Sequence, residues 1–162
     1  MTALKAGRKV FFHLFIFQIV DMRWGVRDEA TDDHMTTTIC LEEIRNCQET
    51  SIGPNFIFFG GQKYGYRPVP TLISCGEFEK ILRTLSDLEK DASLLLEWYD
   101  KDLNANPPVM ILQPISSILP NFLNKSAPTL QEADQEEWWN ILCQLQDLLR
   151  EATTFMYKVG FL

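Results

Sequence analysis

The sequence predicts an α/β fold in which helices flank a parallel sheet on both faces. Two observations lead to this fold class. Strand-like and helix-like hydrophobic patterns alternate along the chain, and an apolar run at residues 56–59 lies between Gly53-Pro54 and a pair of glycines. Such a run is typical of a central strand buried on both faces. The loop after it, residues 60–70, then lies at the carboxyl end of the strand, where open parallel sheets meet ligands and partners.

Composition narrows the function classes. The chain has 162 residues, of which 46% are hydrophobic, which is enough for one domain with a core. A net charge of -7 argues against a general affinity for nucleic acid or for anionic membranes. The four cysteines lack the paired C-x-x-C spacing of a zinc site, so we predict no metal and reduced thiols in a cytoplasmic protein.

The first elements precede the apolar run. A basic start and the apolar residues 10–20 fit either a targeting segment or a buried strand, and the sequence favours the strand because no cleavage pattern follows. The run is too short to span a bilayer as a helix, so we predict no membrane partner. A charged loop over residues 24–34 leads into a predicted amphipathic helix at 35–47, with Asp32 or Asp33 as its N-cap.

The elements after residue 70 follow from hydrophobic spacing and from proline positions. The last of them is a long amphipathic helix in which one of the adjacent residues Trp138 and Trp139 packs in the core and the other lies at its rim. In chain order we predict a helix at 78–88, a shorter helical piece at 93–99, a turn at 104–108, a strand at 109–112, an irregular connection with one helical turn at 116–128, and the long helix from about residue 130.

Several motifs in order also carry a family resemblance. They are VDMRWGV at 20–26, CLEEIRNC at 40–47, GQKYGYRPVP at 61–70, EWY at 97–99 and the proline pair at 107–108. Over about residues 18–155 they resemble the N-terminal region of the NACHT and WD repeat domain proteins, and linked motifs are more specific than a single one.

The resemblance implies a TIR-like, flavodoxin-like three-layer module that precedes a signalling ATPase and WD repeats in cytoplasmic scaffolds. Residues 1–17 depart from the family pattern, so we expect the usual first strand and helix to be lacking. Residues 18–128 form the expected module, and 129–162 the helix that leads to an ATPase. No G-x-x-x-x-G-K-[ST] motif occurs, so the ATPase activity is not carried over and we expect a short form or fragment.

A catalytic function for this chain would depend on a single carboxylate. The resemblance to TIR-like domains implies NAD cleavage by a helix glutamate, and Glu43 lies on the helix before the predicted central strand. A single carboxylate can stabilise an oxocarbenium-like centre in a suitable pocket. However, residue 39 is isoleucine rather than the aromatic companion, and the adjacent Glu42 lies about 100° away on the helix. The alternative to an interaction module is therefore a NAD glycohydrolase using Glu43.

We predict instead a non-enzymatic interaction module without a cofactor. Its partner is another protein or a second copy, and in longer forms the NACHT ATPase and WD repeats. Aromatic and arginine side chains commonly anchor such interfaces, and the predicted partner-binding residues are Trp24, Tyr64, Tyr66 and Arg67. Gly60, Gly61 and Lys63 fit either a phosphate site or, as we favour, a tight turn in which glycine adopts positive φ.

Overall fold

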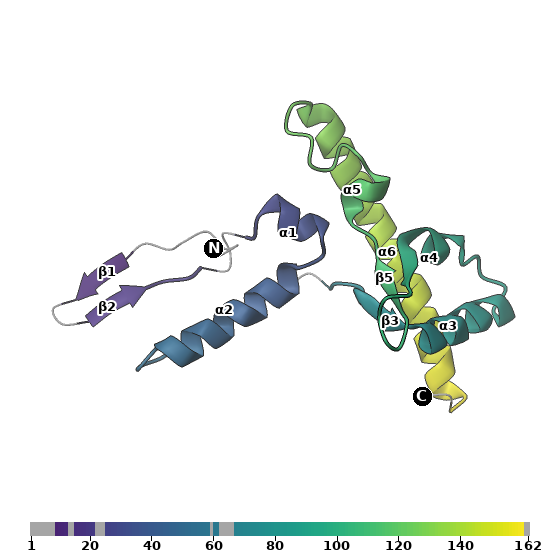
Figure 1. Ribbon diagram of the computed structural model, residues 1–162, viewed down its shortest axis with the longest axis horizontal. Helices are drawn as coiled ribbons and strands as arrows, with labels where there is room; N and C mark the ends of the chain where they lie inside the picture. The colour runs from purple at the N-terminus through teal and green to yellow at the C-terminus, as the bar shows by residue number, and fades with distance from the viewer. Residues whose placement is uncertain (1–8, 13–14, 22–24, 59, 62–66, 161–162) are drawn as a thin grey trace. The chain divides into compact units, whose positions relative to one another are not determined.

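The computed structural model describes residues 9–12, 15–21, 25–58, 60–61 and 67–160. The chain divides into two compact units, Met1–Arg67 and Pro68–Leu162. Figure 1 labels all the helices of both units and all the strands except β4. Within the described ranges, no helix combines the length and the apolar character that a membrane span requires.

The first unit begins with an antiparallel hairpin of β1 (Lys9–Phe12) and β2 (Phe15–Gln18). Their outer ends pair Lys9 with Gln18. Phenylalanine, valine and isoleucine favour extended backbone, so the strand predicted in this apolar run is confirmed in type. The run forms two short strands that pair with each other rather than one.

Two helices follow in the first unit. The predicted helix at 35–47 is confirmed as α2 (Thr36–Thr50), and the polar stretch before it contains the short α1 (Asp28–Asp32). No residue of α2 is fully buried, and its apolar positions, such as Ile39 and Ile44, are only half-buried. The amphipathic pattern therefore predicts the helix correctly, but the apolar side of this helix is not tightly packed.

The predicted N-cap of α2 is wrong. Met35 occupies that position and makes no side-chain capping bond. Asp33 instead ends α1, and Asp32 is buried within α1. The two helices join through a tight turn in which His34 has a φ of 57° and the N–H of Met35 donates to the carbonyl of Ala30 at 2.8 Å. Both aspartates belong to the end of α1, before the turn, so neither stands at the position that caps α2.

The predicted central strand at 56–59 is also wrong over its described part. Residues 54–58 form no strand, and Phe56, Ile57 and Phe58 are 54%, 71% and 79% exposed. Phe59 lies outside the described residues. An apolar run becomes a central strand only where strands flank it and helices cover both faces, whereas the described strands of this unit pair with each other.

The second unit contains a three-stranded sheet in the order β3-β5-β4. The middle strand β5 (Val109–Leu112) confirms the predicted strand, and the edge strands are β3 (Leu72–Ser74) and β4 (Tyr99–Asp102). Leu72 pairs with Ile111. Neither edge strand was predicted from the hydrophobic pattern.

Both strand pairs in this sheet are antiparallel, so the predicted parallel three-layer sheet is not found among the described strands. For the pair β4 and β5, the connection between them gives the physical reason. Only residues 103–108 join the two strands, whereas a parallel crossover needs about a dozen residues or more. The coarser prediction of a mixed helix-and-sheet fold is confirmed.

The helices of the second unit agree with the hydrophobic spacing. They are α3 (Cys75–Asp87), α4 (Ser93–Trp98), the single turn α5 (Ile115–Ile118) and α6 (Pro128–Lys158). The Ser74 hydroxyl begins α3: it accepts from the Glu77 N–H at 3.2 Å and donates to the Glu77 carboxylate at 2.7 Å. Such a reciprocal cap fixes the first turn of a helix.

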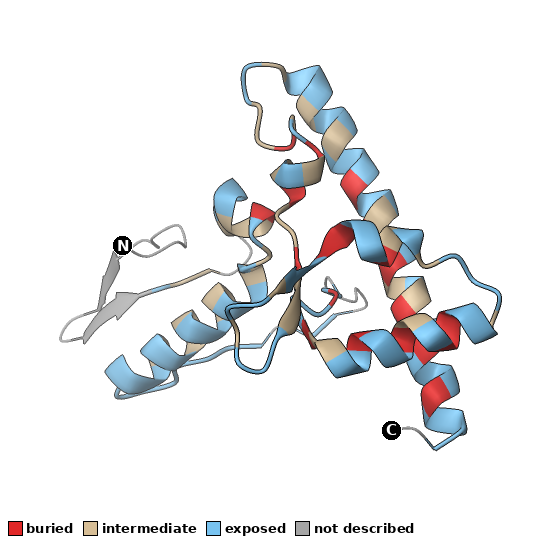
Figure 2. Cartoon of the chain, turned by 45° about the vertical axis from the view of Figure 1, so that its right-hand side comes forward, coloured by how far each residue is buried: buried red, intermediate tan, exposed pale blue. Residues whose placement is uncertain are grey.

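The core of the second unit is built on one face of α6, where buried positions recur along the helix (Figure 2). The prediction that one of the two adjacent tryptophans is buried is confirmed: Trp138 is 3% exposed and Trp139 is 55% exposed. The Trp98 and Trp138 ring centroids lie 4.9 Å apart. The buried residues of α6 are Trp138, Leu142, Leu145, Leu149, Ala152 and Met156, at alternating steps of four and three.

Candidate functional site

The predicted partner-binding edge is described only in part. Trp24, Tyr64 and Tyr66 lie outside the described residues, and Arg67 is exposed at the end of the first unit. Arg67 makes an interaction within the chain. The edge therefore stays a prediction.

The tight turn that we favoured at the glycine pair stays a prediction, because residues 59 and 62–66 on either side of the pair lie outside the described residues. Gly60 and Gly61 themselves are exposed. A side chain at position 60 would approach the Phe58 ring to 3.2 Å, whereas position 61 is open. Lys63, the third candidate for a phosphate site, lies outside the described residues.

Glu43 is half-buried on α2 and has a structural partner. Its carboxylate accepts a hydrogen bond from the Asn46 side-chain amide at 3.4 Å. One turn further along, burial raises the pKa of the Cys47 thiol, and the charge of Glu43 raises it further. Cys47 is therefore a protonated thiol at neutral pH. Separately, no group of three or more candidate metal ligands occurs among the described residues.

The exposed side of α6 is a feature that the sequence analysis did not single out. Six positions, each one residue after a buried one, repeat the same steps of four and three and follow one line along the helix. Trp139 is 55% exposed at one end of this line, and Tyr157 is 75% exposed at the other. We call this line the aromatic flank: Trp139, Cys143, Gln146, Arg150, Thr153 and Tyr157.

The aromatic flank carries little charge. Arg150 is its single formally charged residue, and the guanidinium donates to the Asp147 carboxylate at 3.1 Å. Both side chains are more than half exposed, so the pair contributes at most about 1 kcal/mol. A rigid helix with large exposed rings at both ends and a nearly neutral centre has the chemistry of a protein-contact surface.

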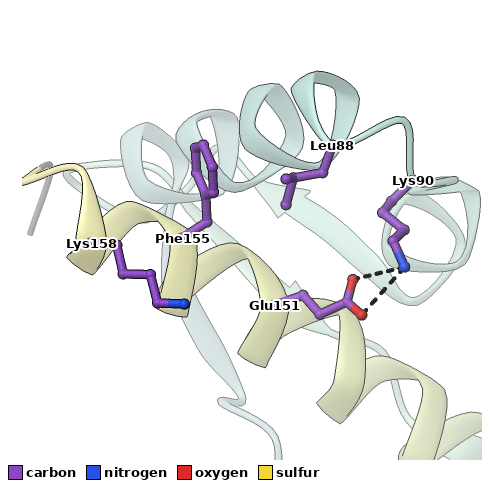
Figure 3. A pocket seen from close by; sticks show the side chains of 5 residues that line it. All are labelled: Leu88, Lys90, Glu151, Phe155 and Lys158. Atoms are coloured by element: carbon purple, nitrogen blue, oxygen red, sulfur yellow. Dashed lines mark hydrogen bonds and ion pairs between the residues drawn. The ribbon is translucent and has the colours of Figure 1, made fainter.

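A shallow hollow lies elsewhere in the second unit, between the end of α3 and the last turns of α6 (Figure 3). It encloses about 320 Å³ and is lined by Leu88, Lys90, Glu151, Phe155 and Lys158. The Lys90 ammonium lies 3.1 Å from the Glu151 carboxylate and closes one end. The hollow is open and has one ion pair at its rim, which suits packing between two helices better than substrate binding.

Tyr99 ties the beginning of the second unit to its sheet. Its hydroxyl donates to the Pro70 carbonyl at 2.6 Å, and the ring is 2% exposed and lies 5.5 Å from the Phe78 ring. Burial raises the pKa of the Tyr99 hydroxyl well above its usual value. The folded state therefore holds the neutral hydroxyl as a donor.

This pKa shift predicts a loss of stability in alkali. The unfolded chain ionises Tyr99 near pH 10, the usual tyrosine pKa, while the folded chain keeps it protonated. The contribution of Tyr99 to stability is therefore fully present below about pH 10. Above that pH the free energy of unfolding falls by up to about 1.4 kcal/mol per pH unit. Urea titrations at a series of alkaline pH values measure this slope.

Tyr99→Phe should flatten the alkaline slope, and Tyr157→Phe is the matched control because it removes a hydroxyl from an exposed ring. Equal slopes for the wild type and Tyr99→Phe would contradict the assignment. At neutral pH the Tyr99→Phe variant should lose about 1 kcal/mol, the usual contribution of one hydrogen bond.

These observations define a small mixed helix-and-sheet module with a line of exposed side chains along α6. The comparisons with known proteins then identify its relatives. The chain is 37% identical over 128 residues to mouse NACHT domain- and WD repeat-containing protein 1, which covers 78% of the chain. The chain is also 29% identical over 144 residues to human NACHT and WD repeat domain-containing protein 2, and this match covers 89% of the chain.

The chain belongs to the NACHT and WD repeat domain-containing proteins, as a homologue of one part of them. It spans 8% of the length of either relative named above. A shorter match, 34% identical over 68 residues and 42% of the chain, is to mouse telomerase protein component 1, of which it covers 2%. No protein-family model matches the chain, and no solved structure matches it.

Proposed function

We propose that the chain is a non-enzymatic protein-interaction and scaffold module that binds other proteins through the aromatic flank of α6. One observation carries this proposal: Trp139 and Tyr157 are exposed on the same helix whose neighbouring side, about 100° away, packs in the core. The buried side fixes the positions of the exposed rings, so little ordering entropy is lost when a partner covers them.

The homology supports a role in assembly. The relatives combine a NACHT domain with WD repeats according to their names, and a module with a rigid exposed surface can contact such neighbouring parts. The proposed partners are therefore the NACHT and WD repeat portions of these longer proteins. The role depends on the second unit and does not require a TIR-like sheet.

The cysteines support a cytoplasmic location for this role. All four, Cys40, Cys47, Cys75 and Cys143, are free thiols, which is the usual state of cysteine in a reducing compartment. Cys143 lies exposed on the aromatic flank itself. A contact surface that includes an accessible thiol is best preserved where thiols stay reduced.

Binding to the mouse relative tests the proposal. The full chain is immobilised, and its affinity for NACHT domain- and WD repeat-containing protein 1 is measured by biolayer interferometry. Trp139→Asp should weaken binding roughly 30-fold or more, because an aromatic anchor of an interface can contribute about 2 kcal/mol or more. The variant should keep its helical circular dichroism, since Trp139 is exposed.

Leu96→Asp is the matched control. Leu96 is 59% exposed on α4, so the substitution adds the same charge to another exposed apolar position of the same unit. Its affinity should equal that of the wild type. Equal binding by Trp139→Asp and by the wild type would remove the aromatic flank as the contact surface.

A further inference from the structure

We infer that the aromatic flank of α6 pairs with the same flank of a second copy of this chain, with the two helices antiparallel. This inference rests on the proposed function and names one partner of the same surface. It depends on how the chemistry of the flank repeats when the helix is followed in either direction.

The spacing of the flank is the same in both directions. Its six positions follow steps of four, three, four, three and four. A two-fold axis perpendicular to α6 near position 148 therefore places each flank residue level with another flank residue of the second copy. Trp139 lies level with Tyr157, Cys143 with Thr153, and Gln146 with Arg150. The interface is isologous, as in most protein dimers.

The side chains that meet in this register are chemically compatible. An aromatic ring lies beside an aromatic ring at both ends, and offset or tilted ring pairs are favourable beyond the effect of burying their area. The small Cys143 and Thr153 lie between the rings and the centre, where they let the helices approach. In the middle, a side-chain amide meets a guanidinium, and its oxygen can accept from the guanidinium.

Charge selects the antiparallel arrangement over the parallel one. Arg150 is the single formal charge of the flank. In a parallel pair it would face Arg150 of the second copy, whereas the antiparallel pair places it beside the neutral Gln146. Like charges in direct contact are unfavourable, so the position of Arg150 favours the antiparallel pair over the parallel one.

The contact is long enough for a specific but modest dimer. From Trp139 to Tyr157 the helix rises about 27 Å at 1.5 Å per residue. Trp139 is 55% and Tyr157 75% exposed, so each can bury only that part of the about 150–250 Å² of an aromatic side chain. The four rings of a dimer therefore supply roughly half of the about 1,000 Å² that a specific interface needs, and the flank residues between the rings supply the rest. Because each copy carries a net charge of -7, added salt should strengthen the dimer by screening the repulsion between the two copies.

Sedimentation velocity of the full chain over a concentration series tests the pairing. The wild type should show a monomer–dimer equilibrium that shifts towards dimer as the salt concentration rises. Trp139→Asp and Tyr157→Asp should each raise the dissociation constant at least tenfold, while Leu96→Asp should leave it unchanged. A wild-type chain that stays monomeric throughout would overturn the inference.

Disulfide trapping tests the direction of the helices. In a background with Cys40, Cys47 and Cys75 replaced by serine, Thr153→Cys should give a disulfide-linked dimer under mild oxidation, because position 153 lies level with Cys143 of the second copy. Cys143 alone should not crosslink, since the two Cys143 residues lie about 15 Å apart along the helix axis. Glu137→Cys, exposed on the other side of α6, is the matched control.

The outcomes separate this inference from the proposed function. Crosslinking through Cys143 alone would indicate a parallel pair and overturn the antiparallel arrangement. If the chain is monomeric but Trp139→Asp still loses binding to the mouse relative, the flank binds a different protein and only the self-pairing is wrong. If Trp139→Asp changes neither measurement, both proposals are wrong.

Discussion

Replacing Trp98 by alanine is expected to lower the free energy of unfolding of the second unit by about 3–5 kcal/mol, the usual cost of removing a buried tryptophan. Trp98 is completely buried at the end of α4, and its ring lies 4.9 Å from that of Trp138 on α6. The substitution leaves a cavity where these two elements meet. Since domains are typically stable by about 5–15 kcal/mol, this loss removes a large part of the stability.

Urea denaturation followed by circular dichroism measures the effect of Trp98→Ala. The matched control is Trp139→Ala, which removes the same side chain from an exposed position of the unit. Its stability should stay within about 0.5 kcal/mol of the wild type, as for most surface substitutions. A similar loss in both variants would mean that the Trp98 contact does not hold α4 to α6.

Leu145→Asp should prevent the second unit from folding at neutral pH. Leu145 is completely buried at the middle of α6, and an unpaired carboxylate there costs several kcal/mol in addition to the lost apolar contacts. Gln144→Asp is the neighbouring control, because residue 144 is exposed. Nuclear magnetic resonance spectra should lose their dispersion in the first variant and keep it in the second.

A folded Leu145→Asp variant with nearly normal stability would show that the α6 face is not packed as described. Protonation of the new carboxyl group gives a further check. Burial favours its neutral form, so the pKa of the folded state lies above the unfolded value of about 3.9. The variant should therefore be more stable relative to the wild type as the pH falls towards 4.

Local signals in the sequence were sufficient for the helices of the second unit. In α6 the buried residues recur at steps that place them on one side of a helix, and no other regular structure gives that pattern. In α3, the residues from Phe78 onwards have the same property. Strand β5 was also predictable, because four apolar residues lie between proline-containing turns.

The sheet could not be predicted in the same way, because strand pairing depends on distant residues. β3 has three residues, and β4 carries the charged residues Asp100, Lys101 and Asp102, so neither shows the alternation of a strand. The apolar run at 56–59 has a strand-like composition, but composition does not supply the neighbouring strands that a buried position needs. The direction of β4 relative to β5 follows from the short 103–108 connection, and the predicted turn at 104–108 had this meaning only once β4 was known.

The sequence was sufficient to predict the buried series of α6, but not the aromatic flank beside it. The pair Trp138-Trp139 indicated that one ring is exposed, but the sequence analysis looked for partner contacts in the loops. The signal that marks the aromatic flank is the second series of α6, one residue after the core series. It is visible in the sequence once the core series is known, because successive residues of a helix lie about 100° apart.

The position of α6 at the end of the second unit has a consequence for synthesis on the ribosome. The face that completes the core, from Trp138 to Met156, is translated after α3, α4 and the whole sheet. Until it emerges, the apolar sides of Phe78, Leu85 and Trp98 have no helix to cover them. The nascent unit therefore exposes apolar surface for most of its translation. Its core is completed last, when α6 packs against the elements that were translated before it.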